Sequence, residues 1–224
     1  MQKLTLFDLD HTLIPMDSDY EWGVFTTALG WNDSKDFERR NQEFFQQYKD
    51  GTLDIHAYVR FATSAARVKG PELAAQAHSQ YMADVIAKAI KPQALDLVHA
   101  HQAAGDWVLV VTATNEWVTR PIAQAFGVTE LIAIDLVRDP LTGWITGEIQ
   151  GIPSFRDGKV ARVHAWLQAR GLDWKDVHST FYSDSLNDLA LLERVNHPVA
   201  TNPDDRLRAV ASARSWRILD LFEN

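Results

Sequence analysis

The chain contains no cysteine, which excludes disulfide bonds, thiol nucleophiles and thiolate metal sites. We therefore expect any bound metal to have oxygen ligands. Positive charge is also scarce, because 22 lysines and arginines stand against 30 aspartates and glutamates, giving a net charge of -8. Nucleic acids and anionic membrane surfaces are bound by clustered basic residues, so we expect neither as a partner and favour small-molecule chemistry.

Long apolar runs are missing as well. The first apolar stretch, Leu4 to Leu9, is short and is interrupted by Asp8. It fits neither a signal peptide nor a membrane span, so we expect a cytoplasmic protein. The sequence implies no protein partner.

The composition is that of an ordinary globular protein. Apolar residues make up 46% of the 224 residues and charged residues make up 23%. This length suits one α/β domain, or a core domain that carries a smaller insertion.

Short apolar runs followed by polar residues predict the strands of a parallel sheet. The clearest runs are Leu4–Phe7, Trp107–Val111 and Thr180–Tyr182, and weaker ones are Leu131–Ile134, Pro198–Ala200 and Arg217–Leu219. Helical patterns lie between them, at Pro92–Ala104, Trp117–Phe126, Lys159–Arg170 and Asn187–Val195. This alternation predicts an α/β fold, a doubly wound, Rossmann-like parallel sheet that binds ligands at the carboxyl ends of its strands.

One long segment interrupts the alternation. Residues 16–89 read as helical throughout, with Gly30, Gly51 and Gly70 as boundaries, and predict a helical cap inserted into a core of residues 1–15 and 90–224. Residues 138–151 predict a β-hairpin with its turn at Leu141-Thr142-Gly143.

Four aspartates follow two of the predicted strands. Asp8 and Asp10 come after the first, and Asp184 and Asp188 after the third. Each could be a turn or helix-cap residue, but that role does not explain four carboxylates at one edge of a sheet. Like charges raise each other's pKa, so a hard divalent cation is the natural compensation, and Mg²⁺ suits oxygen ligands.

Two further residues suit a phosphate group. Lys159, after Gly158 at the start of a predicted helix, can supply a compact positive charge, although most lysines lie on the surface. Thr112, together with the backbone N–H groups that follow it, can donate hydrogen bonds, although it could equally be a residue that ends a strand.

These segments, in order, resemble the four motifs of the haloacid dehalogenase superfamily, and the insertion resembles the cap of its phosphoserine phosphatase-like branch. The segments are Phe7-Asp8-Leu9-Asp10-His11-Thr12-Leu13, Val110-Val111-Thr112-Ala113, Gly158-Lys159 and Ser183-Asp184-Ser185-Leu186-Asn187-Asp188. The resemblance implies a Mg²⁺-dependent phosphatase that forms an aspartyl phosphate on a small phosphorylated metabolite.

The resemblance also implies roles for single residues. Asp8 would be the nucleophile, and Asp10 the general acid and base. Phosphate binding would fall to Thr112, Ala113, Lys159 and Asn187, and metal binding to Asp8, Asp10 (through its backbone carbonyl), Asp184 and Asp188.

In this family the cap usually selects the substrate. The candidates for that role are Asp17, Asp19, Glu21, Trp22, Phe25, Arg60 and Arg67. The acids could hold a substrate ammonium or belong to an acidic first helical turn, and the aromatics could be helix core.

Several substrates and two other functions stay open. Phosphoserine phosphatases carry a glutamate near the position of Asp17 and an arginine near that of Ala62, so this chain departs from them at both places. The resemblance therefore leaves phosphoserine, histidinol phosphate or a similar compound as substrate. A phosphomutase or a non-catalytic phospho-ligand-binding domain are the alternatives.

Overall fold

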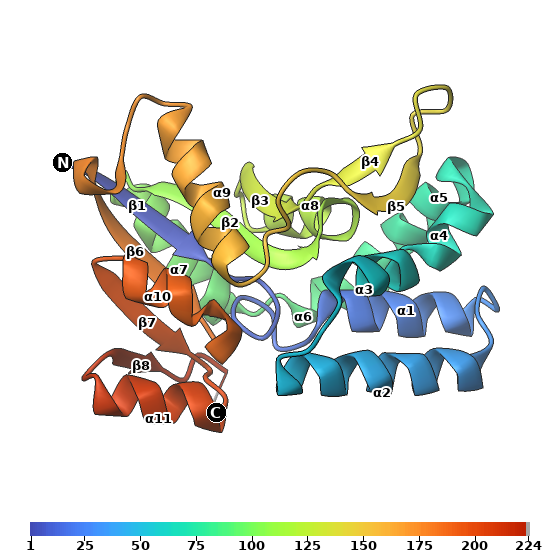
Figure 1. Ribbon diagram of the computed structural model, residues 1–224, viewed down its shortest axis with the longest axis horizontal. Coiled ribbons are helices and arrows are strands. Elements are labelled where there is room, and N and C mark those ends of the chain that lie inside the picture. The colour runs from blue at the N-terminus through green and yellow to red at the C-terminus, as the bar shows by residue number, and fades with distance from the viewer. Residues whose placement is uncertain (223–224) are drawn as a thin grey trace.

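A six-stranded parallel sheet forms the centre of the molecule in the computed structural model, which describes residues 1–222 (Figure 1). Its strand order is β3-β2-β1-β6-β7-β8. The strands are β1 (Gln2–Phe7), β2 (Trp107–Asn115), β3 (Glu130–Ile134), β6 (Val177–Ser183), β7 (His197–Thr201) and β8 (Arg217–Leu219). The predicted strands and the predicted Rossmann-like fold class are thus confirmed.

Alternating side chains of the sheet enter two separate cores. Leu4 and Leu6 of β1 pack with α9 (Asp157–Gln168), α10 (Leu189–Arg194) and α11 (Asp205–Ala213) on one face. On the other face, Phe7 packs with α7 (Pro92–Ala103) and α8 (Glu116–Ala125). Figure 1 shows α9 and α10 in front of the sheet and α7 behind it.

Two short 3₁₀ turns precede elements of the core. They are η2 (Trp174–Asp176), before β6, and η3 (Leu186–Asp188), before α10. The prediction of one continuous helix over Asn187–Val195 is therefore wrong in its first turn, because the Ser185 hydroxyl accepts the N–H of Asn187 and closes a tighter turn.

The segment between β1 and α7 is helical, as predicted. Its elements are α1 (Ser18–Ala28), α2 (Ser34–Asp50), α3 (Ile55–Ala62), α4 (Ser64–Lys69), α5 (Pro71–Tyr81), the π-helical turn η1 (Met82–Ile86) and α6 (Ala87–Ala89). Aspartates cap α1, α2 and α3 through hydrogen bonds to backbone N–H groups. Gly51 ends α2 in the left-handed conformation, which glycine adopts without steric cost.

The predicted hairpin is present as β4 (Leu136–Arg138) and β5 (Ile145–Ile149). Asp139 accepts the N–H groups of Leu141 and Thr142 and so shapes the turn. β5 lies against α3 and α4, so the hairpin joins the inserted helices. Within residues 1–222, no helix is both long and apolar enough to cross a membrane.

Candidate active site

The chain turns sharply where β1 ends. The carbonyl of Leu9 accepts the N–H groups of Thr12, Leu13 and Ile14, and His11 has a positive φ of 56°. This turn brings Asp8 and Asp10 close enough for the charge of Asp10 to raise the pKa of Asp8. The turn that the sequence analysis expected is present and places the two carboxylates near each other.

Lys159 occupies the middle of the site and is 2% exposed. Its Nζ donates to Asp8 Oδ1 and to Asp188 Oδ2, each at 2.7 Å. Burial lowers its pKa, but the charges of Asp188 and Asp8 outweigh burial and hold the pKa of Lys159 above its usual value. Lys159 is therefore a permanently charged part of the site, not the surface lysine of the alternative interpretation.

A glycine allows the lysine to be placed there. A Cβ at Gly158 would lie 2.0 Å from the carbonyl oxygen of Pro153. Any other residue would push the preceding loop away from the first turn of α9, on which Lys159 is mounted.

The loop after β6 brings the second pair of carboxylates to the first. The Thr12 hydroxyl lies 3.4 Å from Asp8 Oδ2 and 3.3 Å from Asp184 Oδ1, and it accepts the N–H of Asp184 at 3.1 Å. The Ser183 hydroxyl donates to Asp188 Oδ2 at 2.7 Å, the same oxygen that accepts from Lys159. Burial is the main cause that raises the pKa of Asp184 well above its usual range and that of Asp188 to about 6.

Asp10 is held by two donors on its carboxylate. Ser18 donates its backbone N–H to Oδ1 at 2.8 Å, and Thr114 donates its hydroxyl to Oδ2 at 2.7 Å. Burial, followed by repulsion from Asp17, raises the pKa of Asp10 to about 6, and these two hydrogen bonds oppose the rise. The carboxyl group can therefore both donate and accept a proton near neutral pH.

The predicted phosphate-binding residues lie near this cluster to different degrees. Thr112 is 1% exposed, and its hydroxyl accepts the N–H of Thr114 at 3.1 Å, so Thr114 and not Thr112 touches a carboxylate. Ala113 lies between them and is half-buried. Asn187 accepts a hydrogen bond from Arg156 Nε at 3.3 Å.

Two of the cap candidates extend the acidic cluster. Asp17 caps α1 by accepting the N–H of Tyr20 at 2.9 Å. Asp19 is 4% exposed and accepts the side-chain amide of Asn115 at 2.9 Å. Burial, with repulsion from Asp17 and Asp10, raises the pKa of Asp19 well above its usual range.

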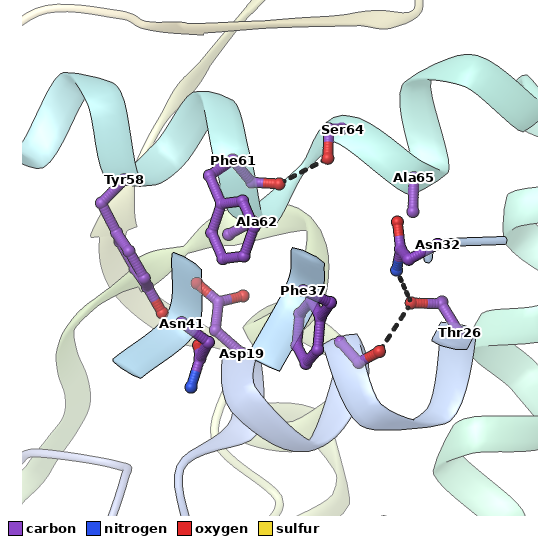
Figure 2. Close-up of a pocket in the computed structure, with 11 residues that line it drawn as sticks. Asp19, Thr26, Asn32, Phe37, Asn41, Tyr58, Phe61, Ala62, Ser64 and Ala65 are labelled. Carbon is purple, nitrogen blue, oxygen red and sulfur yellow. Dashed lines mark hydrogen bonds between the residues drawn. The ribbon is translucent and has the colours of Figure 1, made fainter. Parts of the chain in front are cut away.

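Asp19 also lines a small cavity inside the cap (Figure 2). The cavity has a volume of about 10 Å³, and Figure 2 shows the Asp19 carboxylate rising from α1 between Tyr58 and Phe37. The other described residues around it are Gly23, Thr26, Asn32, Asn41, Phe61, Ala62, Ser64 and Ala65. Of these described residues, none is basic.

The remaining cap candidates lie elsewhere. Trp22 is 1% exposed and packs against Trp117, with ring centroids 5.1 Å apart, so it is part of the core. Arg60 pairs with Glu148 at 3.1 Å, and Arg67 donates to the carbonyl of Arg60. The last two candidates, Glu21 and Phe25, are half-buried on α1 and do not line the cavity.

The donor set suits a hard divalent cation. Within residues 1–222, no three histidine, aspartate or glutamate side chains are grouped so that they could hold a metal ion by themselves. Magnesium usually takes only one or two carboxylates and completes its shell with water and substrate phosphate. Asp8 Oδ2 and Asp184 Oδ1 lie around one hydroxyl and fit this requirement, although Asp8 Oδ1 accepts from Lys159. Both Asp10 oxygens and Asp188 Oδ2 accept from other donors.

Several residues of the site escaped the sequence analysis. Five of them supply hydroxyl or amide groups that hold the carboxylates: Thr12, Ser18, Thr114, Asn115 and Ser183. The other two, Tyr48 and Arg156, form hydrogen bonds with Ser185 and Asn187. Thr12 and Ser183 stand inside the quoted motifs, so their position was a usable signal. Tyr48, whose hydroxyl lies 2.9 Å from Ser185 Oγ, belongs to α2 and carries no such signal.

Comparisons with known proteins agree with this geometry. The haloacid dehalogenase-like hydrolase family matches residues 5–193. A histidinol-phosphatase of Neisseria meningitidis serogroup C (strain 8013) is 39% identical over 221 residues, which cover 98% of this chain and 99% of that protein.

Solved structures agree as well. A protein of unknown function from Bordetella pertussis Tohama I has a crystal structure with 46% identity and a TM-score of 0.92, covering 99% of this chain and 100% of that chain. A substrate-bound phosphoserine phosphatase has 17% identity and a TM-score of 0.67 over 98% of this chain and 93% of that chain, and so shares the fold. The predicted enzyme class, a phosphatase, is confirmed by the family and the full-length relative. The chain belongs to the haloacid dehalogenase-like hydrolase family.

Proposed function

We propose that the chain hydrolyses histidinol phosphate or a closely similar phosphomonoester of an amino alcohol. One observation carries the choice of substrate: Asp10, Asp17 and Asp19 form an acidic group that reaches from the reacting carboxylates into a cavity whose described lining has no basic residue. A substrate amine or imidazolium would neutralise this group. Phosphoserine also carries a carboxylate, which would lie unpaired against these acids.

The first chemical step uses Asp8 as nucleophile. Its carboxylate oxygen forms a bond to phosphorus as the bond from phosphorus to the alcohol oxygen breaks, which leaves an aspartyl phosphate and a free alcohol. Lys159, 2.7 Å from Asp8 Oδ1, balances the charge on the phosphoryl oxygens. Burial of this ion pair excludes water, so the attraction is stronger than on the surface.

Asp10 moves the proton in both steps. In its protonated form it gives a proton to the departing alkoxide, and in its ionised form it takes one from the water that attacks the aspartyl phosphate. A pKa of about 6 suits both roles. Thr114 and the backbone of Ser18 fix the direction of the carboxyl group.

Mg²⁺ is the proposed cofactor, held by Asp8, Asp184 and the backbone carbonyl of Asp10, with Asp188 supporting the site. It would supply positive charge that neutralises the transferring phosphoryl group. Thr112, Ala113 and Asn187 stay proposed phosphate contacts. The division into a core of residues 1–15 and 90–224 and a cap of residues 16–89, and the cytoplasmic location, also stay predictions.

The proposal is tested by phosphate release from histidinol phosphate, phosphoserine and a generic aryl phosphate, with and without Mg²⁺. We expect Mg²⁺-dependent release, the highest kcat/KM for histidinol phosphate, and no measurable release by Asp8→Asn. Reaction in ¹⁸O-labelled water should place one labelled oxygen in the phosphate, whereas a mutase would move the phosphoryl group to a second hydroxyl. A higher kcat/KM for phosphoserine would contradict the substrate proposal, and activity in Asp8→Asn would contradict the mechanism.

A further inference from the structure

One half of the sheet has no helix on its second face. α9, α10 and α11 cover the face that carries Leu4, Leu6 and Phe181. On the opposite face α7 and α8 pack over β1, β2 and β3, and no described helix lies over β7 or β8. A groove of about 530 Å³ remains there, lined by residues of β6, β7 and β8 and by His101 of α7.

The residues that line this open-face groove are polar. Strand alternation places Thr180 and Tyr182 of β6, His197 of β7 and Arg217 of β8 on the same face. His197 lies 2.5 Å, Nε2 to Nε2, from His178, the next residue of β6 on that face.

A buried network fixes the donors at one wall of the groove. Asp106, whose side chain is 6% exposed, accepts from His101 Nδ1 at 2.7 Å and from the Thr5 hydroxyl at 3.0 Å. The other ring nitrogen of His101 lies 2.8 Å from the Tyr182 hydroxyl. Because both ring nitrogens are engaged, the imidazole and the phenol are held in one orientation toward the groove.

The groove has one fixed cation in a chain of net charge -8. Arg217 lies in its described lining, which has no carboxylate of its own, and the nearest acid, Asp106, lies behind His101 and is hydrogen-bonded to it. Burial raises the pKa of the Tyr182 phenol, Arg217 is close enough to oppose this rise, and Asp106 adds to it.

Both ring nitrogens of His101 and the Tyr182 hydroxyl are already engaged within the network. The groups that face an anion are therefore the Arg217 guanidinium, the second ring nitrogen of His197 and the Thr180 hydroxyl. A guanidinium with neighbouring N–H and O–H donors binds phosphate and carboxylate oxygens.

We propose that the open-face groove is a second ligand site, which binds a small organic anion bearing phosphate or carboxylate groups. The volume lies within the range of small-molecule pockets, about 300–1,000 Å³. Val199, on the same face as Arg217, adds an apolar floor on which the carbon skeleton of such a ligand can rest. The site is separate from the carboxylate cluster, because an anion in the groove faces donors and not Asp8, Asp184 or Asp188.

The site is tested by titrating the full-length chain with sodium citrate and, separately, with sodium phosphate in EDTA at low ionic strength. Binding is followed by calorimetry and by the ring proton NMR signals of His101 and His197. We expect one of the anions to shift both signals saturably. The double variant Arg217→Gln/His197→Gln should raise the Kd of that anion at least roughly tenfold. Citrate and phosphate distinguish a carboxylate ligand from a phosphate ligand.

Arg39→Gln is the matched control. Arg39 is an exposed arginine of α2 with a side-chain exposure of 59%, so its loss changes the net charge as Arg217→Gln does without touching the groove. The control should bind the anion as the wild type does. An unchanged Kd in the double variant, or histidine signals that neither anion shifts, would overturn the proposal.

A second copy of the chain is the competing occupant. Light scattering at the concentrations of the titration should give the mass of a single chain. A dimer that Arg217→Gln dissociates would assign the groove to self-association and overturn the proposal. Melting temperatures within a few degrees of the wild type show that the variants are folded.

Discussion

Two groups of buried carboxylates lie side by side in this protein, and they are balanced in different ways. Asp8 and Asp188 share the ammonium group of Lys159, which is as buried as they are. Asp10 and Asp19 have only neutral donors: within residues 1–222, no lysine or arginine forms an ion pair with either. The first group contains its own cation and the second does not.

The difference suggests how the work of the site is divided. Every phosphomonoester carries a negative phosphoryl group, and the fixed lysine beside Asp8 can neutralise it whatever the rest of the substrate is. The buried acids that have no cation repel one another until a ligand supplies positive charge, so they can favour a substrate that carries an amine over one that does not. The following variants test this division, beginning with the largest expected effect.

The largest effect is expected for Asp10→Asn. The variant keeps the shape of the side chain but cannot transfer a proton, so kcat should fall by roughly 10²- to 10⁴-fold. The loss should be smaller for an aryl phosphate with an acidic leaving group, which needs little protonation. An equal loss for alkyl and aryl substrates would mean that Asp10 does not act as the general acid.

Lys159→Met removes the cation shared by Asp8 and Asp188. Activity should fall by about 10²- to 10³-fold for every substrate. The free energy of unfolding should also fall, by about 3–5 kcal/mol, because Asp8 and Asp188 are left buried without their counter-charge. Chemical denaturation at pH 7 and pH 5 measures this, and acid should restore part of the loss by protonating Asp188, whose pKa of about 6 in the wild type rises further once the lysine is removed.

Asp19→Asn tests the group without a cation. We expect KM for histidinol phosphate to rise roughly tenfold, as loss of one charged contact implies, with little change for an aryl phosphate that lacks an amine. A rise of equal size for both substrates would show that Asp19 only supports the structure of the cap.

The same variant should stabilise the protein. The pKa of Asp19 is raised in the folded state, so folding favours the protonated form, and stability is lost as the pH rises from the unfolded pKa of about 3.9 through the folded value. Asp19→Asn removes this penalty. Its melting temperature should therefore exceed that of the wild type at pH 7, and the gap should narrow at acidic pH.

The smallest effect is expected for Thr114→Val. The variant removes a hydrogen bond to the ionised form of Asp10, so the pKa of Asp10 should rise from about 6 by about one unit. Aspartyl phosphate formation needs protonated Asp10 and slows above this pKa, whereas its hydrolysis needs ionised Asp10 and slows below it. Both limbs of the pH profile should therefore move to higher pH. Thr119→Val, which removes a buried hydroxyl that donates to the carbonyl of Asn115 and not to Asp10, is the matched control.

Much of this arrangement could be predicted from the sequence, because its strands are short apolar runs that end in polar residues. Leu4–Phe7 and Thr180–Tyr182 lie side by side in the sheet, and this pairing brings Asp8 and Asp184 together. The resemblance gave Lys159 its role, and the structure explains the glycine before it, because a Cβ at Gly158 would meet the carbonyl oxygen of Pro153.

The supporting contacts could not be predicted. Thr114 reaches Asp10 across 104 positions of sequence, and Tyr48 reaches Ser185 across 137. A single hydroxyl changes neither the hydrophobic period nor the turn pattern, so no local signal marks it. Trp22 was a substrate candidate but packs against Trp117 in the core. The sequence pattern of an aromatic residue on an amphipathic helix is the same in both cases, so it could not decide between them.

The exposed position of helix α2 bears on how a substrate enters the cap. None of its residues is buried, and its end is tied to the core by the Tyr48 hydroxyl and by Arg206, which donates to the carbonyl of Lys49. The cavity behind the helix has room for about one water molecule, too little for the side chain of a metabolite. A substrate side chain therefore fits this cavity only after α2 moves, and we expect the polar contacts at its tip, together with the packing of Phe37 and Phe44 on Phe61, to resist that movement.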